Sequence, residues 1–165
     1  MNKNKWNTKI ISLCRRDDED RAPKFRKVCK ILNAECHISD LEDEKLNELP
    51  VEEIINRIKK FNLHKNYDYI FTHGKNGEYG HIRHKEINKA VKQMLNNKEL
   101  TCEKLFFFSY VRRNKFCHAD KNPDKFIRLK DNLLTEKKYL IHNVYGFDTG
   151  SFEEKSARGF ETFKL

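Results

Sequence analysis

The chain has 165 residues, a length that suits one domain spanning residues 1–165 with a modest hydrophobic core. Charged residues make up 36% of the sequence, but the apolar residues are clustered and periodic, which excludes an intrinsically disordered chain. The formal net charge of +9 is compatible with nucleic-acid binding. The lysines do not form one dense block, however, and their spread over solvated helix faces explains the charge better.

The first predicted unit is a strand, a helix and a second strand. Lys9–Cys14 is a short apolar run typical of a buried strand, and a charged loop, 15–21, follows it. Pro23 suits the first turn of a helix, and Asn33 is a plausible stop for it. Ala34–Ile38 has the pattern of a second strand. The apolar face of the helix consists of Phe25, Val28, Cys29 and Leu32.

The next unit repeats this alternation. Pro50 is expected to start a helix, and Tyr67–Thr72 reads as a third strand. A glycine-rich loop, 73–80, leads to a helix predicted over Lys85–Leu95. The first of these helices carries Val51, Ile54, Ile55 and Ile58 on one face.

The remaining pattern predicts one more strand and one more helix. Lys104–Val111 is almost continuously apolar, as expected for the middle of a parallel sheet, and Leu134–Val144 reads as a helix. The tail, 145–165, has no clear assignment. Alternating strands and helices predict an α/β fold, a Rossmann-like parallel sheet with helices on both faces. Ligands of such folds bind beyond the carboxyl ends of the strands.

The cysteines and the apolar runs indicate a cytoplasmic protein. The chain has five cysteines, an odd number, and none of them forms a Cys-x-x-Cys pair. No apolar segment typical of a signal peptide follows Met1. The longest apolar run, Leu105–Phe108, is far too short to span a membrane.

His81 and His84 are the leading candidates for catalytic chemistry. They lie three residues apart, behind a glycine-rich loop and at a strand-to-helix junction. Imidazoles in such a place suit metal-assisted hydrolysis, because glycines let the backbone approach a ligand closely. The alternative is a solvent-exposed pair on a basic helix. His73, just before Gly74, is expected to line the same cleft.

Acidic and basic residues near the other strand ends are weaker candidates. Asp17 and Asp18 could act as a metal ligand and a base, but the neighbouring arginines could equally neutralise them. Asp20 could cap the following helix. Arg21 is placed to hold an anionic or polyhydroxylated substrate, and Asp40 to accept hydrogen bonds from a sugar hydroxyl. The alternative for Arg21 is a surface ion pair, and the alternative for Asp40 is an ordinary turn residue.

The string Thr-His-Gly-x-x-Gly-Glu-Tyr-Gly-His-x-x-His over residues 72–84 resembles the second metal motif of the PIG-L/LmbE-like N-deacetylases. The resemblance extends from Lys9 to Phe147. It implies a zinc hydrolase that removes acetyl groups from N-acetylglucosamine-type or related amides. By the same resemblance, His84 is the zinc ligand and His81 steadies the oxyanion and protonates the leaving amine. Arg21 and Asp40 would contact the substrate.

The chain departs from the family pattern in two places. Ile82 and Arg83 stand where the family often has Pro-Asp, and the first signature, His-Pro-Asp-Asp, is absent. Aligning Lys9–Cys14 with the second strand of the family places the missing strand and helix before Met1. This predicts an exposed sheet edge prone to self-association. It also leaves open a non-catalytic remnant that binds a sugar or another ligand.

Overall fold

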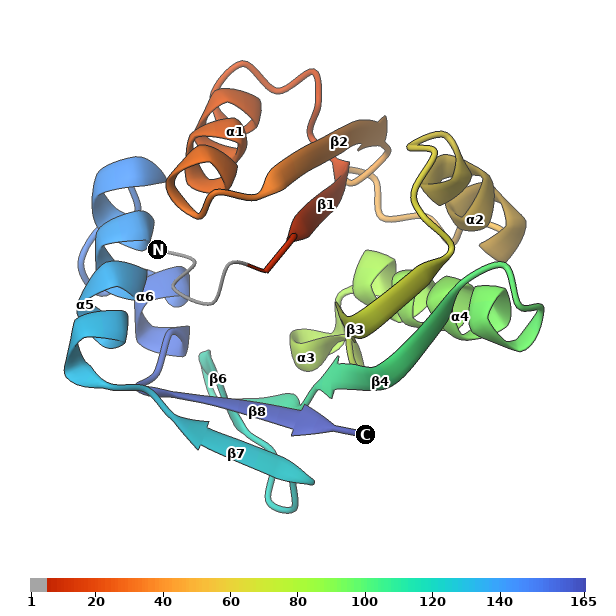
Figure 1. Ribbon diagram of the computed structural model, residues 1–165. Helices are drawn as coiled ribbons and strands as arrows, with labels where there is room; N and C mark the ends of the chain where they lie inside the picture. Colours follow the sequence, from red (N-terminus) through yellow and green to blue (C-terminus); the bar gives the residue numbers. More distant parts are fainter. Residues whose placement is uncertain (1–5) are drawn as a thin grey trace.

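The computed structural model describes residues 6–165 and begins with two parallel strands joined by a helix (Figure 1). Strand β1 (Lys9–Cys14) pairs in parallel with β2 (Glu35–Leu41), and α1 (Arg21–Ile31) connects them. The predicted first strand is confirmed at both ends. The helix begins two residues before Pro23, and its Cys29 is buried as its position on the apolar face indicated.

The second unit carries most of the hydrophobic core. It comprises α2 (Val51–Lys59), β3 (Asn66–Thr72), the short α3 (Gly77–Gly80), α4 (Ile82–Asn96) and β4 (Thr101–Phe108). Strands β3 and β4 are parallel, and α2 packs against α4. The predicted apolar face of α2 lies in the core, where Ile54 is fully buried. Its buried neighbours are Leu13, Leu41, Ile55, Ile58, Ala90, Val91, Met94 and Leu100.

The C-terminal third departs most from the predicted pattern. The strand expected over Lys104–Val111 ends at Phe108, and β5 (Tyr110–Arg113) forms a hairpin with β6 (Phe116–Ala119). Strand β8 (Phe160–Lys164) pairs antiparallel with β4, and β7 (Lys125–Arg128) pairs antiparallel with β8 at the edge of the sheet. The helix predicted near Leu134–Val144 is present as α5 (Asp131–Tyr139) and a π-helical turn, η1 (Leu140–Val144). The short α6 (Phe152–Ser156) follows.

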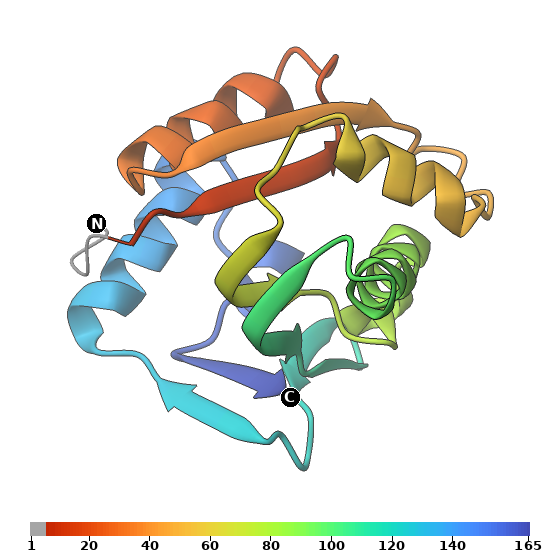
Figure 2. The ribbon, with the colours of Figure 1, turned by 45° about the vertical axis from the view of Figure 1, so that its right-hand side comes forward.

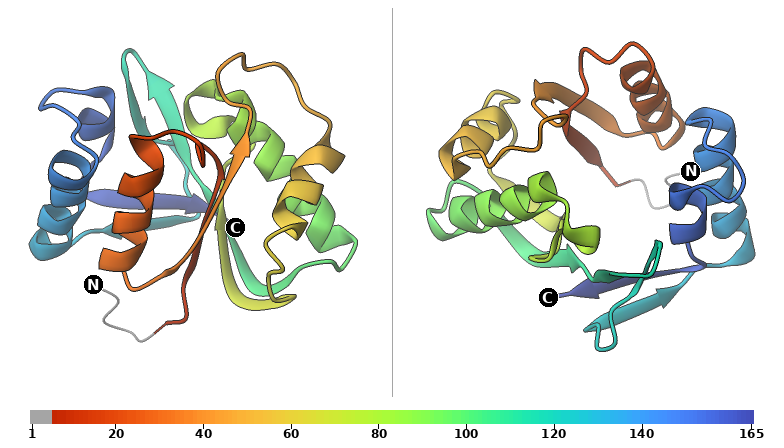
Figure 3. Two further views of the ribbon diagram at one scale, coloured as in Figure 1. Left: turned by 90° about the horizontal axis from the view of Figure 1, so that it is seen from above. Right: turned by 180° about the vertical axis from the view of Figure 1, so that it is seen from behind.

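The fold is a mixed α/β arrangement, but the described strands form three sheets instead of one. The sheets are β1–β2, β3–β4–β8–β7 and β5–β6. Seen from above, α1 lies on one side of the parallel strands and α2 and α4 lie on the other (Figure 3). Strands β1 and β3 do not pair and lie apart in the ribbon (Figure 2). Residues of both strands line a cavity of about 1290 Å³.

The structure also describes the cysteines and the lengths of the helices. All five cysteines are free thiols. Within residues 6–165, no helix has the length and apolar character needed to cross a bilayer.

Candidate metal centre

The loop after β3 is built around a close backbone approach at Gly74. A Cβ atom at this position would lie 2.4 Å from the carbonyl oxygen of Phe108, so only glycine fits without a shift. The Gly74 amide donates a 2.7 Å hydrogen bond to Oε1 of Glu78. Gly77 and Glu78 both have positive φ, 65° and 57°. This turn points the Glu78 carboxylate back toward the end of β3.

Glu78 joins two histidines through one oxygen. Its Oε2 lies 3.0 Å from Nδ1 of His73 and 2.5 Å from Nδ1 of His84. The two imidazole rings stack, with centroids 3.7 Å apart and planes 15° apart. One ligand atom from each residue lies within 4.8 Å of the others, and this is the one such group found in the described part of the chain. The three side chains could therefore hold a metal ion.

The Glu78 carboxylate is strongly held in its ionised form. Burial alone would raise its pKa, but the hydrogen bonds with His73 and His84 and the Gly74 amide overcome that effect and lower the pKa to about 2. Glu78 therefore offers a charged oxygen at neutral pH, and a metal ion prefers such a ligand.

His81 lies beside this group but has a different partner. Its ring centroid is 4.8 Å from that of His84, and its Nε2 is 3.6 Å from Oδ1 of Asp43. Burial and the neighbouring His84 lower the pKa of His81, while Asp43 opposes that shift. Nδ1 of His81 and Oδ1 of Asp43 are buried and have no hydrogen-bond partner among residues 6–165. His81 is thus a largely neutral imidazole backed by a carboxylate.

Arg83 fixes the segment that brings Asp43 to His81. Its side chain is only 1% exposed and donates to the Glu42 carbonyl at 2.6 Å. It also donates to the carboxylates of Glu86 at 2.6 Å and of Glu42 at 2.8 Å. Glu86 in turn accepts the Leu49 amide at 2.8 Å. The first turns of α4 are therefore tied to the segment that follows β2.

The acidic loop after β1 serves local structure. Asp17 pairs with Arg16 at 3.1 Å. Asp18 accepts the backbone amides of Asp20 and Arg21, at 3.0 and 2.7 Å, while the Asp20 side chain makes no cap. The expectation that Asp20 caps α1 is therefore wrong. The side chain of Asp18, two residues earlier, is the one that reaches the free amides.

Arg21 and Asp40 lie among other partners. The Arg21 guanidinium stacks over Phe147, 4.6 Å from the ring centroid. Asp40 accepts from Arg57 and, at 2.7 Å, from Arg16. The hydrogen bond from its own backbone amide, together with these two arginines, lowers the pKa of Asp40 against the opposing effect of burial. None of these contacts involves the histidines, so the substrate roles of Arg21 and Asp40 stay predictions.

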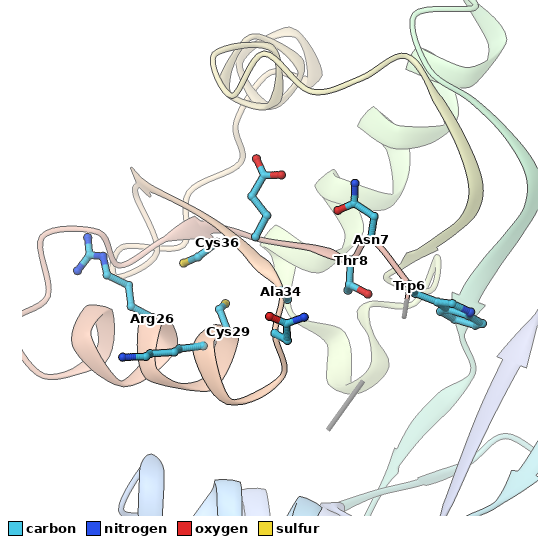
Figure 4. A pocket seen from close by; sticks show the side chains of 10 residues that line it. Trp6, Asn7, Thr8, Arg26, Cys29, Ala34 and Cys36 are labelled. Carbon is cyan, nitrogen blue, oxygen red and sulfur yellow. The ribbon is translucent and has the colours of Figure 1, made fainter. Parts of the chain in front are cut away.

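A second cavity, of about 620 Å³, lies between α1 and the start of β2 and has no histidine in its lining (Figure 4). Cys29, Cys36 and Arg26 line it, and burial raises the pKa of the Cys29 thiol to about 12. Such a thiol is a poor nucleophile at neutral pH. The chemistry of this protein is better sought at the histidines.

Comparison with known proteins identifies the family of this chain. The profile of the PIG-L family, described as GlcNAc-PI de-N-acetylase, matches residues 2–95, more than half of the chain. The chain belongs to the PIG-L family. The matched region runs through β1 to the end of α4 and includes His73, Glu78, His81 and His84.

The chain is also similar to a viral protein. The chain is 27% identical over 118 residues to the uncharacterized protein L374 of Acanthamoeba polyphaga mimivirus. This covers 66% of the chain and 50% of that protein. The chain thus spans about half the length of the relative it matches. No solved structure matches it.

The sequence alone did not indicate a role for two of the residues at this site. Glu78 was part of the glycine-rich string, but its role depends on the turn that folds it between His73 and His84. An acidic residue between two histidines in such a loop was the available signal. Asp43 gave no signal, because a buried arginine on another element brings its segment to His81.

Proposed function

We propose that this chain carries the zinc site of an N-deacetylase-type hydrolase, acting on N-acetylglucosamine-like or related N-acyl amides. The observation that carries the proposal is the meeting of His73, Glu78 and His84 in a chain of the PIG-L family. Two imidazole nitrogens and one carboxylate oxygen are the donor set of many catalytic zinc sites. The residues present therefore fit the metal.

The three side chains share one role in this proposal. His84, His73 and Glu78 would hold the ion, and His84 is the ligand implied by the family motif. Zinc, when bound, supplies Lewis acidity toward the acyl carbonyl. The low pKa of Glu78 supports a charged oxygen ligand at neutral pH.

His81 is proposed as the acid–base residue. Its lowered pKa leaves it free to accept a proton, and Asp43 behind it stabilises the charged imidazole that results. A proton held on His81 can then pass to the leaving amine. Arg21 and Asp40 are proposed to bind the sugar part of the substrate.

Residues 1–165 are proposed to form a Rossmann-like sheet in which the place of the family's first strand is not filled by any of the described strands. The unpaired facing edges of β1 and β3, and the cavity between them, support this interpretation. A strand missing there also accounts for the absent His-Pro-Asp-Asp motif. The activity proposed here therefore belongs to the family, and zinc binding is the first property to test in this chain.

Zinc content of the purified protein tests the proposal. We expect about one zinc per chain, lost in His84→Ala and retained in His118→Ala, a histidine on β6 outside the cluster. Acetate release from N-acetylglucosamine substrates then separates an enzyme from a remnant that only binds sugar. Zinc that persists equally in His84→Ala, or no zinc in the unaltered protein, would contradict the proposal.

A further inference from the structure

One peptide group beside the candidate metal centre is held at both ends. It joins His73, the residue after β3, to Gly74. The carbonyl of this peptide accepts a 2.7 Å hydrogen bond from Nδ2 of Asn88 on α4. Its N–H donates a 2.7 Å hydrogen bond to Oε1 of Glu78. The peptide therefore links Asn88 to two of the three candidate ligands, His73 and Glu78.

Asn88 comes from the helix that supplies the third candidate ligand. His84 and Asn88 are four residues apart on α4, about one helical turn, so both side chains leave the same side of the helix. Helix α4 packs against β3 (Figure 1). Through Asn88 the helix holds the end of this strand, where the rings of His73 and His84 stack with centroids 3.7 Å apart. One helix thus fixes two ligands relative to each other.

Asn88 is a polar residue on the buried side of α4. It is only 5% exposed, and its buried neighbours on the helix include Ala90, Val91 and Met94. A buried amide costs free energy unless it is hydrogen-bonded, and an aliphatic side chain would fill the same place without that cost. The amide of Asn88 donates to the backbone of the site. Packing alone does not require an asparagine here.

The hydrogen bond from Asn88 also strengthens the one to Glu78. A donor on the carbonyl polarises the peptide, so the N–H at its other end becomes a better donor. That N–H holds Oε1 of Glu78, while Oε2 faces both histidines. The position of the peptide therefore sets the direction in which Oε2 points.

We propose that Asn88 is a positioning residue of the metal centre. By holding the carbonyl of His73, it keeps the imidazole of His73 and the carboxylate of Glu78 in place for a metal ion. This role rests on the proposed function, since it concerns the same site. Residues that orient ligands without touching the metal typically contribute about 10–100-fold to metal affinity.

Zinc affinity gives the first test. Asn88→Leu keeps a similar side-chain size and removes the donor, and Asn88→Ala removes the donor with no added bulk. Both variants should bind zinc about 10–100-fold more weakly in competition with a chromophoric chelator. Val91→Ala, 7% exposed on the same helix, is the control, because its truncation lowers stability and leaves the hydrogen bond to His73 in place. Equal zinc affinity in the Asn88 variants and the control overturns the proposal.

Cobalt(II) in place of zinc gives a second readout, one that a loss of stability does not move. The visible absorption of cobalt(II) depends on the kind and arrangement of its ligands. At saturating cobalt, Asn88→Leu should show shifted or weakened bands, because His73 and Glu78 lose their fixed positions. Val91→Ala should give the spectrum of the unaltered protein. Identical spectra for all three proteins overturn the proposal.

The failure of this role and the failure of the proposed function give different results. Zinc that is lost in His84→Ala but bound at full affinity by both Asn88 variants overturns only the role of Asn88. Absence of zinc from the unaltered protein overturns the role and the proposed function together.

Discussion

Glu78 combines a strained backbone with a buried charge at the centre of the candidate site. Its φ of 57° lies in the left-handed region, which costs a non-glycine residue about 1 kcal/mol or more. Its carboxylate accepts from His73, His84 and the Gly74 amide. The strain persists because these contacts fix the turn. Such a residue could bind a ligand without rearrangement, because its position is already set by these contacts.

The ionisation of Glu78 predicts a pH dependence of stability. Its pKa falls from 4.5 to about 2 on folding, so its charge stabilises the folded protein above pH 4.5, and this contribution is lost as the pH falls toward 2. Glu78→Gln should therefore melt at a lower temperature than the unaltered protein at neutral pH, and the difference should narrow by about pH 3. Metal-free samples followed by circular dichroism provide the measurement. Glu19→Gln, at an exposed loop position, is the control, and a difference that stays constant with pH would contradict this account.

Between elements, a buried arginine joins α4 to the segment after β2. Arg83 has carboxylates of Glu86 and Glu42 as partners, and Glu86 is itself only 5% exposed at its side chain. A charge in such a place is tolerated only with its partners present. The network also holds Asp43 near His81, so the integrity of the fold and the environment of the site depend on the same contacts.

Removal of Arg83 should therefore destabilise the protein strongly. Arg83→Ala leaves the Glu86 carboxylate buried without its cation, and losses of about 3–5 kcal/mol in the free energy of unfolding are typical of such changes. Lys92→Ala removes an exposed positive charge from the same helix and should change stability by less than about 0.5 kcal/mol. Urea denaturation measures both. Similar midpoints for the two variants would show that the buried network contributes little.

The sequence correctly predicted the helices and strands whose apolar pattern is long and regular. β1, α2, β3 and the body of α4 lie where the pattern placed them, within a few residues. It did not predict β7, a four-residue strand whose side chains are all exposed, because such a segment becomes a strand only by pairing with β8. The histidine motif was visible in the same way, but the positions of Glu78 and Asp43 depend on a turn and on a tertiary contact. Local patterns do not encode either of these.

At the scale of the whole molecule, the parallel strands are divided into two groups. β1 and β2 form one pair and β3 and β4 belong to another sheet, so the apolar interior is open at the edges between them. Tyr69 and Phe71 of β3 are 39% and 47% exposed beside this opening. Exposed aromatic residues next to unpaired edges favour association with another chain. The predicted self-association follows from the same feature.

Hydrogen exchange should reveal these open edges directly. Amides of β1 and β3 that do not pair with β2 or β4 should exchange much faster than the amides of the β3–β4 ladder, because water reaches them without unfolding. NMR-detected exchange at low protein concentration makes the comparison within one sample. Slow exchange at both edges would mean that they are already covered in solution. Protection that rises with protein concentration would then identify the cover as a second copy, since only an intermolecular contact depends on concentration.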